Sequence, residues 1–231
     1  MGQIRDFSDE RNKIFCPYCG RTTEPKNRDH VPSKVLLDEP YPKNLPTIHP
    51  CQKCNSDFSK DEEYVPCLIE WARAGSASID GINRKKIRKI LSSKPGIASK
   101  LGDASERIRG WLLLEEDSSR IASLMHKLGQ GHVAYELGEP ILSSPDSLMF
   151  RPLAALSSGE LDLFETPPRF SLLAETGSRA LTRQVQSRTG AADWIVVQPG
   201  RYRYLTFLDD VILVRLVISE FLACEITWNR P

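Results

Sequence analysis

The sequence lacks a hydrophobic run long enough to cross a bilayer. The longest apolar stretch, Val211 to Ile218, is interrupted by Arg215, whereas a membrane-spanning helix needs about 20 apolar residues. The first residues, Met1 to Asp6, also lack the apolar segment of a secretory signal. We therefore expect a protein of the cytoplasm that has no membrane partner.

An excess of one charge is also missing. The chain has 31 Lys and Arg residues against 30 Asp and Glu residues, which leaves a formal net charge of +1. Such a charge does not by itself indicate a polyanionic partner, so an argument for nucleic acid must rest on local clusters. Internal repeats and low-complexity tracts are absent too, and 231 residues can form one large domain or two small ones.

A helical pattern of apolar residues is present downstream of a region rich in Cys, His, Asp and Asn. Apolar side chains recur at positions i, i+3, i+4 and i+7, namely at Tyr64, Cys67, Leu68 and Trp71. This spacing predicts one face of an amphipathic helix. The segment 59–62 has the form of a capping box, so the helix is expected to begin near Lys60 and to end near Gly75. Pro66 predicts a kink or a later start.

The rest of the chain divides into helices and then strands. Two helical stretches are expected within residues 84–109, separated by a breaker at 94–96. A further helix is expected from Asp117 to about Leu128, ended by Gly129 and Gly131. Short β-rich runs cover residues 195–197, 202–207, 211–218 and 221–228, with a turn at 208–210. The sequence therefore predicts an α+β protein with a C-terminal antiparallel sheet.

Four of the six cysteines form two C-x-x-C pairs, which are Cys16 with Cys19 and Cys51 with Cys54. Four thiolates can complete a tetrahedral shell around zinc, so we expect one structural Zn²⁺ at these residues. The alternative is two redox-active or unligated pairs, but clustered cysteines in a reducing compartment more often bind metal. Cys67 and Cys224 lie in apolar segments and are expected to be core residues.

Polar residues of the kind used in catalysis lie between and beside the two cysteine pairs. Arg28-Asp29-His30-Val31-Pro32 comes first, Asn44 follows, and Asn55 comes directly after Cys54. In this order the residues resemble the HNH, or ββα-metal, nuclease family in its zinc-knuckle form, as a His-Asn-Asn variant. The proline follows Val31 directly, whereas the family has one residue in between. The resemblance covers residues 16–55 only.

The resemblance implies a role for each of these residues. His30 is expected to be the general base that takes a proton from water, because imidazole titrates close to neutral pH. In the family, the residues matching Asp29 and Asn55 hold a divalent ion, and two oxygen ligands favour Mg²⁺ or Mn²⁺ over zinc. Asn44 matches the residue that fixes the loop carrying the base through hydrogen bonds to the backbone. Taken singly, each residue could instead form a turn or a cap.

A basic segment follows the cysteine-rich region. Residues 84–109 contain nine Lys and Arg residues against two acidic ones, and such a segment can follow a phosphate backbone. We expect Lys85, Lys86 and Lys89, together with Arg28, to contact nucleic acid. The alternative is a solvated helix face. The alternating segment Arg201–Tyr204 is interpreted as a hairpin that faces water rather than as a platform on which bases stack.

The sequence therefore predicts two parts: residues 1–75 as a zinc-stapled HNH module, and residues 76–231 as an α+β accessory domain that recognises substrate or a protein partner. The expected activity is metal-dependent endonucleolytic hydrolysis of phosphodiester bonds, with DNA as the expected substrate and restriction or phage defence as the expected role. The alternative is a zinc-stapled nucleic-acid-binding module that has lost catalysis. An interaction subunit that uses the zinc module only as a scaffold is the third possibility.

Overall fold

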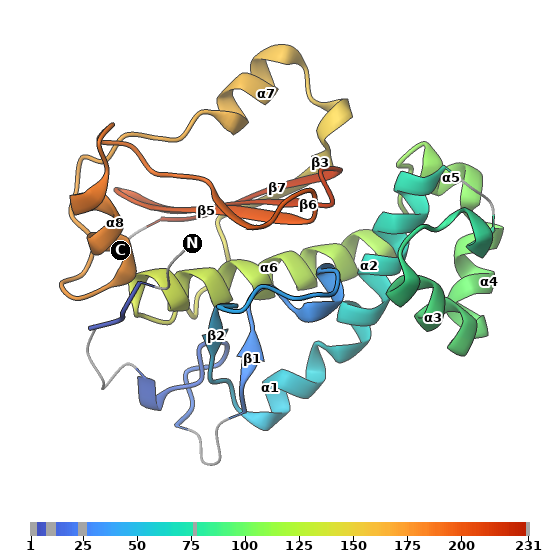
Figure 1. Ribbon diagram of the computed structural model, residues 1–231, viewed down its shortest axis with the longest axis horizontal. Coiled ribbons are helices and arrows are strands. Elements are labelled where there is room, and N and C mark those ends of the chain that lie inside the picture. Colours follow the sequence, from blue (N-terminus) through green and yellow to red (C-terminus); the bar gives the residue numbers. More distant parts are fainter. Residues whose placement is uncertain (1–3, 8–12, 23–26, 76–77, 230–231) are drawn as a thin grey trace.

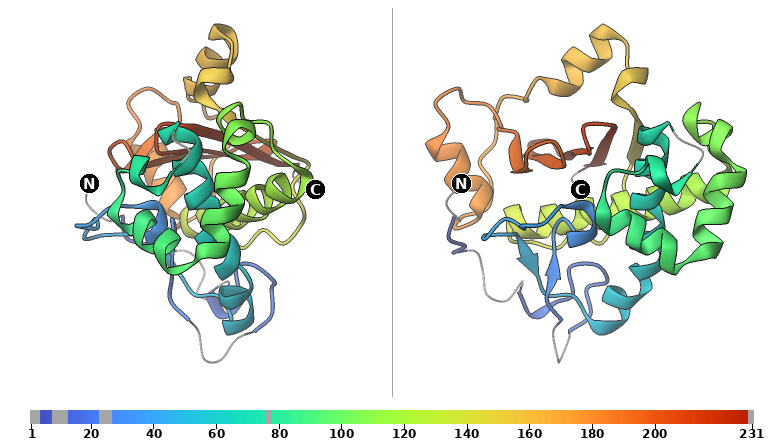
Figure 2. Two further views of the ribbon diagram at one scale, coloured as in Figure 1. Left: turned by 90° about the vertical axis from the view of Figure 1, so that its right-hand side faces the viewer. Right: turned by 45° about the vertical axis from the view of Figure 1, so that its right-hand side comes forward.

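One long helix, α6 (Glu115–Leu137), crosses the middle of the molecule and separates two layers (Figure 1). The computed structural model describes residues 4–7, 13–22, 27–75 and 78–229. A five-stranded sheet lies on one side of α6, and a two-stranded pair lies on the other side (Figures 1 and 2). The pair and the helix after it are β1 (Asp29–His30), β2 (Thr47–Ile48) and α1 (Gln52–Asp57).

The middle of the chain is helical, as expected. The helices that follow α1 along the chain are α2 (Ser59–Ala74), α3 (Lys85–Ser93), α4 (Pro95–Asp103) and α5 (Ser105–Arg109). The predicted bounds of α2 are confirmed, with Gly75 in the left-handed conformation at φ 61°. The predicted capping box at 59–62 is not formed, because Phe58 is the N-cap residue and no side chain caps the helix. Pro66 lies inside the helix, so the later start that it was expected to cause does not occur. None of the helices in the described ranges is long and apolar enough to cross a membrane.

Residues 84–109 divide at the expected breaker and once more beyond it. Pro95 is the first residue of α4, a position where proline removes no helical hydrogen bond because the first N–H groups have no partner within the helix. A second break separates α4 from α5 at Ala104. Both breaks let the short helices turn back onto α2, where Trp71 Nε1 donates a hydrogen bond of 2.8 Å to Ser105 Oγ.

The sheet is antiparallel and has the strand order β3-β7-β6-β5-β4. Its strands are β3 (Ser147–Pro152), β4 (Ile195–Gln198), β5 (Tyr202–Leu208), β6 (Val211–Ile218) and β7 (Leu222–Asn229). The last four confirm the prediction, since β-branched and aromatic runs between turn residues favour strands. Two further helices, α7 (Ser158–Glu165) and α8 (Arg179–Gln186), join β3 to β4, and α7 lies beyond the sheet face that points away from α6 (Figure 2).

The prediction that Gly129 and Gly131 end the helix expected from Asp117 is wrong, because α6 continues through both to Leu137. Their lack of a side chain serves packing instead. A Cβ atom on Gly129 would lie 2.7 Å from Ile226 Cδ1 in the sheet, and one on Gly131 would lie 2.9 Å from Val31 Cγ2 next to β1. The two glycines therefore let α6 approach both layers closely, which offsets the cost of glycine within a helix.

This role of Gly129 predicts opposite effects for two Gly→Ala substitutions. Gly129→Ala should lower the free energy of unfolding by about 1–3 kcal/mol, the usual cost of overpacking, because Trp228 also lies 2.9 Å from the new Cβ. Gly102→Ala in α4 meets nothing within 4 Å and should raise the same free energy by up to about 1 kcal/mol. Urea denaturation of both variants measures the difference, and equal stabilities would contradict the packing argument.

The largest core cluster includes side chains from both sides of the expected domain boundary at residue 75. Leu36 and Tyr64 belong to it together with Leu128 and Ile226. A second, smaller cluster joins the N-terminal region to α6 and contains Cys16, Tyr18, Val31, Ile48 and Tyr135. The first 75 residues thus share their apolar contacts with α6, and the proposed two-domain division stays a prediction.

Candidate functional site

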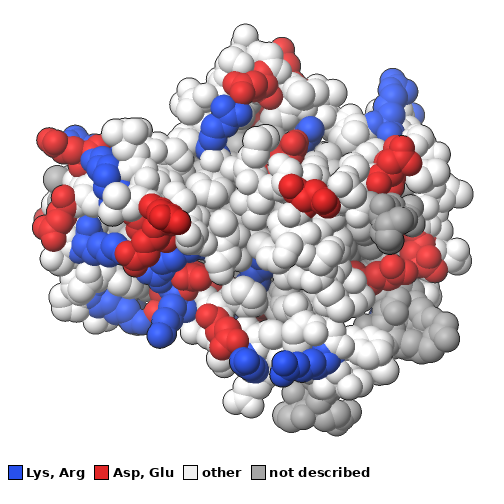
Figure 3. Space-filling view, turned by 180° about the vertical axis from the view of Figure 1, so that it is seen from behind, with Lys and Arg blue, Asp and Glu red and all other residues white. Residues whose placement is uncertain are grey.

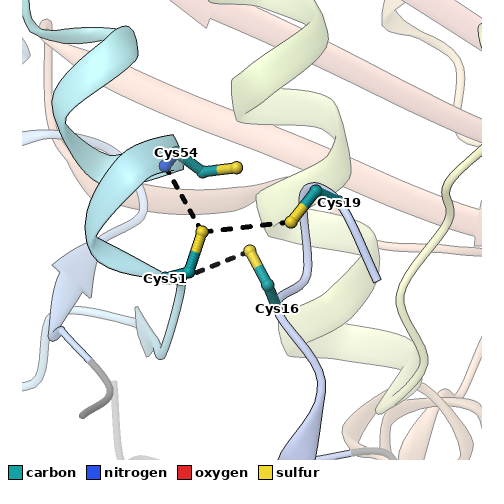
Figure 4. A group of neighbouring side chains, drawn as sticks. All are labelled: Cys16, Cys19, Cys51 and Cys54. Carbon is teal, nitrogen blue, oxygen red and sulfur yellow. Dashed lines mark hydrogen bonds between the residues drawn. The ribbon is translucent and has the colours of Figure 1, made fainter. Parts of the chain in front are cut away.

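The four cysteines expected to bind zinc lie together beside the first turn of α1 (Figure 4). Their sulfur atoms all lie within 4.8 Å of one another, and the Sγ atoms of Cys19 and Cys51 are 3.9 Å apart. A tetrahedral zinc site with bonds of about 2.3 Å has sulfur–sulfur distances of about 3.8 Å. The donor set and its spacing therefore fit one Zn²⁺ ion.

Each cysteine pair is shaped by its own local backbone. In the first pair, Gly20 donates to the carbonyl of Cys16 at 2.9 Å and adopts φ +69°, a conformation that glycine reaches without strain. In the second pair, Cys51 caps the N-terminus of α1, and its sulfur accepts a hydrogen bond of 3.4 Å from the backbone N–H of Cys54. The pairs meet where the N–H of Cys51 donates to Cys16 Sγ at 3.3 Å.

These contacts set the protonation of the thiols. The backbone N–H of Cys54 lowers the pKa of Cys51 to about 7, because it donates to the sulfur and stabilises the thiolate. Burial instead raises the pKa of Cys16 and of Cys54. Cys51 can therefore offer a thiolate at neutral pH, whereas the more buried sulfurs need a bound cation to stay deprotonated.

Asp29 and His30 are the two residues of β1. Antiparallel pairing sets Asp29 opposite Ile48 and His30 opposite Thr47. The His30 side chain is half-buried, and its Nδ1 is a buried atom for which the described residues supply no hydrogen-bond partner. Burial lowers the pKa of His30, and the positive charges of Lys34 and Arg28 lower it further, while Asp29 raises it. The neutral imidazole is thus the favoured form at neutral pH.

Asp29 is held by two partners that the sequence pattern does not reveal. Its Oδ2 accepts a hydrogen bond of 3.0 Å from the Tyr18 hydroxyl and lies 2.8 Å from Nζ of Lys127. The Lys127 side chain is 1% exposed, and its Nζ also donates to Glu62 Oε1 at 2.6 Å. Lys127 neighbours the apolar stripe of α6, but nothing in the local sequence indicates that its partners come from β1 and α2.

The two asparagines lie on different elements. Asn44 is exposed in the loop before β2, and Asn55 is half-buried on α1, where its backbone N–H donates to Cys51 O at 3.0 Å. The structure therefore places Asp29 and His30 on one strand and Asn55 on the helix that follows β2. The roles expected for the side chains of Asn44 and Asn55 stay predictions.

The basic segment, residues 84–109, has fewer unpaired positive charges than its composition implies. Five of its nine cations form ion pairs with acidic side chains, namely Arg84 with Asp38, Lys94 with Glu63, Lys100 with Glu116, Arg107 with Asp117 and Arg109 with Glu106. Lys85, Lys86 and Lys89 instead line a groove of about 780 Å³ next to α3. The expected lysine contacts thus share one surface, while much of the remaining charge is neutralised within the protein.

The interpretation of residues 201–204 as a water-facing hairpin is wrong for its two tyrosines. Tyr202 and Tyr204 are 0% and 1% exposed. The ring of His132, on α6, stacks on the ring of Tyr204 with 3.7 Å between the two ring centres. His132 Nε2 also lies 2.8 Å from the Tyr202 hydroxyl. These residues face the core because alternate positions of β5 point toward α6.

The four-cysteine cluster and the β1–β2 pair together form the candidate site. Sequence reasoning identified the four cysteines, whereas it missed Tyr18 and Lys127, which contact Asp29, and Glu62, which contacts Lys127. Comparisons with protein-family models, with curated proteins and with solved structures each returned no match.

Proposed function

We propose that the chain is a metal-dependent endonuclease of the HNH, or ββα-metal, type that hydrolyses phosphodiester bonds in DNA. The observation that carries this proposal is the order of elements at the site. The antiparallel pair β1–β2 bears Asp29 and His30, α1 follows with Asn55, and the four-cysteine cluster lies at the start of α1. This order and these residue types support the resemblance on which the proposal rests.

His30 suits the role of general base. Phosphodiester hydrolysis needs a group that takes a proton from the attacking water. The lowered pKa of His30 keeps its ring neutral at neutral pH, and the half-buried side chain keeps part of the ring within reach of solvent. Arg28 and Lys34, whose charges act on His30, would attract the phosphate to the same place.

The expected Mg²⁺ or Mn²⁺ ion would bind the oxygen atoms of Asp29 and Asn55. Such hard cations prefer carboxylate and amide oxygens, and when bound the ion would neutralise charge on the phosphate. Both contacts of Asp29 with Tyr18 and Lys127 fall on the same oxygen, Oδ2. The donor types therefore fit a divalent ion, but the nearby ammonium of Lys127 should make its binding weak without substrate.

The same lysine favours a second candidate function. If the charge of Lys127 fully compensates Asp29, the site holds too little negative charge for a divalent ion, and the zinc-stapled module would bind nucleic acid without cutting it. The distance of 2.8 Å between Lys127 Nζ and Asp29 Oδ2 is the observation that favours this alternative.

A cleavage assay separates the two candidates. Supercoiled plasmid DNA incubated with the protein should be converted to nicked or linear forms when Mg²⁺ or Mn²⁺ is added, and should stay supercoiled in dialysed buffer without added ions. Adding a strong chelator is not a suitable control, because it would also remove structural zinc. If the protein binds DNA but cleaves neither DNA nor RNA with any divalent ion, the nuclease proposal is wrong and the binding module is the better assignment.

A further inference from the structure

A groove next to α3 combines charged residues from three parts of the chain. Lys and Arg side chains gather, with acidic ones among them, at the end of the molecule formed by α3 to α5 (Figure 3). The charged residues that line the groove are Asp38, Glu39, Arg84, Lys85, Lys86, Lys89 and Arg201. Five cations thus face two anions, which gives the groove an excess of positive charge.

Asp38, one of the two acidic residues of the groove, is already compensated within the protein. Arg84 Nε lies 2.8 Å from Asp38 Oδ1, and Arg201 pairs with the other oxygen of the same carboxylate. Glu39 accepts a hydrogen bond of 3.1 Å from the Tyr41 hydroxyl. Arg84 is buried and also donates to the carbonyl oxygens of Val35 and Leu37. The excess charge of the groove therefore comes from the lysines of α3.

A tyrosine joins these lysines to the segment that follows β1. Nζ of Lys34 and Nζ of Lys86 lie 5.4 Å and 5.1 Å from the centre of the Tyr41 ring, within the range of a cation–π contact. Lys86 Nζ also donates to the Tyr41 hydroxyl at 2.8 Å and to the carbonyl of Lys34 at 2.9 Å. Lys34 and Lys86 are thus neighbours, although they come from η2 (Lys34–Leu36) and α3.

Lys34 and Arg28 are both carried by the stretch of chain that contains His30, four residues after it and two residues before it. The cations therefore form one series. Arg28 and Lys34 come from the segment that carries His30, Lys34 and Lys86 both contact the Tyr41 ring, and Lys86 lines the groove together with Lys85 and Lys89.

We infer that Arg28, Lys34 and Lys86 form a track that leads the sugar-phosphate backbone of nucleic acid from His30 into the α3 groove, where Lys85 and Lys89 hold it. This inference rests on the proposed nuclease function, since it assigns the substrate path to the same site. Lysine side chains contact phosphates as mobile point charges, so the track fixes the position of the backbone and does not read its sequence.

The track is tested by removing three of its charges. Binding of a labelled DNA duplex is measured without added divalent ions and with His30→Ala in every variant, so that cleavage does not interfere. The triple variant Lys34→Gln, Lys86→Gln and Lys89→Gln should bind DNA more weakly, and the slope of log K against log salt should fall by about one for each phosphate contact removed. Zinc content and melting temperature verify that the variant is folded.

The matched control removes the same charge elsewhere. Arg151, Arg169 and Arg188 are exposed residues of the sheet region, and their triple Gln variant should bind DNA as the parent does. If the first triple variant is unstable, Lys85→Gln with Lys89→Gln alters only exposed positions on α3 and should lower the slope by about two.

Four outcomes decide the inference. Equal binding by the track variant and the control variant would overturn it, as would displacement of DNA by inorganic phosphate at equal phosphate concentration, which would indicate a site for small anions. If the parent protein cuts DNA while the track variants bind like the control, the track is wrong and the nuclease proposal stands. If the parent never cuts DNA while the track variants lose binding, the nuclease proposal is wrong, and the track is kept as the DNA-binding surface of a module that does not cut.

Discussion

Cys51→Ser is expected to abolish zinc binding and to unfold the part of the N-terminal region around the two cysteine pairs. That part packs through the second core cluster, which contains only five buried residues, so apolar burial alone should not hold it together. Structural zinc contributes about 10–16 kcal/mol of folding free energy in isolated zinc-finger modules. Without that contribution the folded form of this part should not be stable. Tyr18 lies between Cys16 and Cys19, so its hydrogen bond to Asp29 should be lost as well.

Cys67→Ser is the matched control for this prediction. Cys67 is fully buried on α2, away from the four-cysteine cluster, and the change should cost about 1–3 kcal/mol for a hydroxyl without its full hydrogen bonds while leaving zinc in place. Metal analysis and thermal melting of the parent and both variants measure the two effects. A full equivalent of zinc in Cys51→Ser, or none in the parent purified without chelators, would contradict the assignment.

The elements that the sequence predicts well are those whose pattern is local. Strands β5 and β6 were expected from apolar runs between turn residues, and α2 from one apolar stripe and a C-terminal glycine, because these signals lie within the element itself. Gly129 shows the limit of such signals. A glycine within a helical pattern indicates an end when only the local sequence is considered, whereas its neighbours Ile226 and Trp228 come from the far end of the chain.

In the candidate site, too, the sequence predicts the local features and misses the contacts made by distant parts of the chain. The spacing within each C-x-x-C pair restricts where its two sulfurs can lie, so the grouping of four cysteines follows from the sequence. The environment of Asp29 does not follow, because Lys127 reaches it from α6 and is itself paired with Glu62 of α2. The sequence also overestimates the free positive charge of the basic segment, because the acidic partners of Lys94 and Lys100 lie on other helices.

His30→Ala is expected to leave the fold, the zinc content and DNA binding intact and to lower the rate of cleavage by roughly two to four orders of magnitude, the usual effect of removing a general base. The fold should survive because His30 is only half-buried. His49→Ala is the matched control: it removes an exposed imidazole just after β2 and should cut DNA at the parental rate. Products of the parent should carry 5′-phosphate and 3′-hydroxyl ends, as the resemblance implies.

A second comparison separates the base from the ion. Asn55→Ala should also lose cleavage, but through weaker binding of the divalent ion, so that raising the Mn²⁺ concentration should restore part of the rate. The same treatment should not restore His30→Ala, because added metal does not replace a proton acceptor. Asn55 is the better choice than Asp29 for this purpose, since removing the Asp29 carboxylate would leave the buried ammonium of Lys127 with one partner fewer and would destabilise the fold. Cleavage by His30→Ala at the parental rate, or its recovery with Mn²⁺, would exclude His30 as the base.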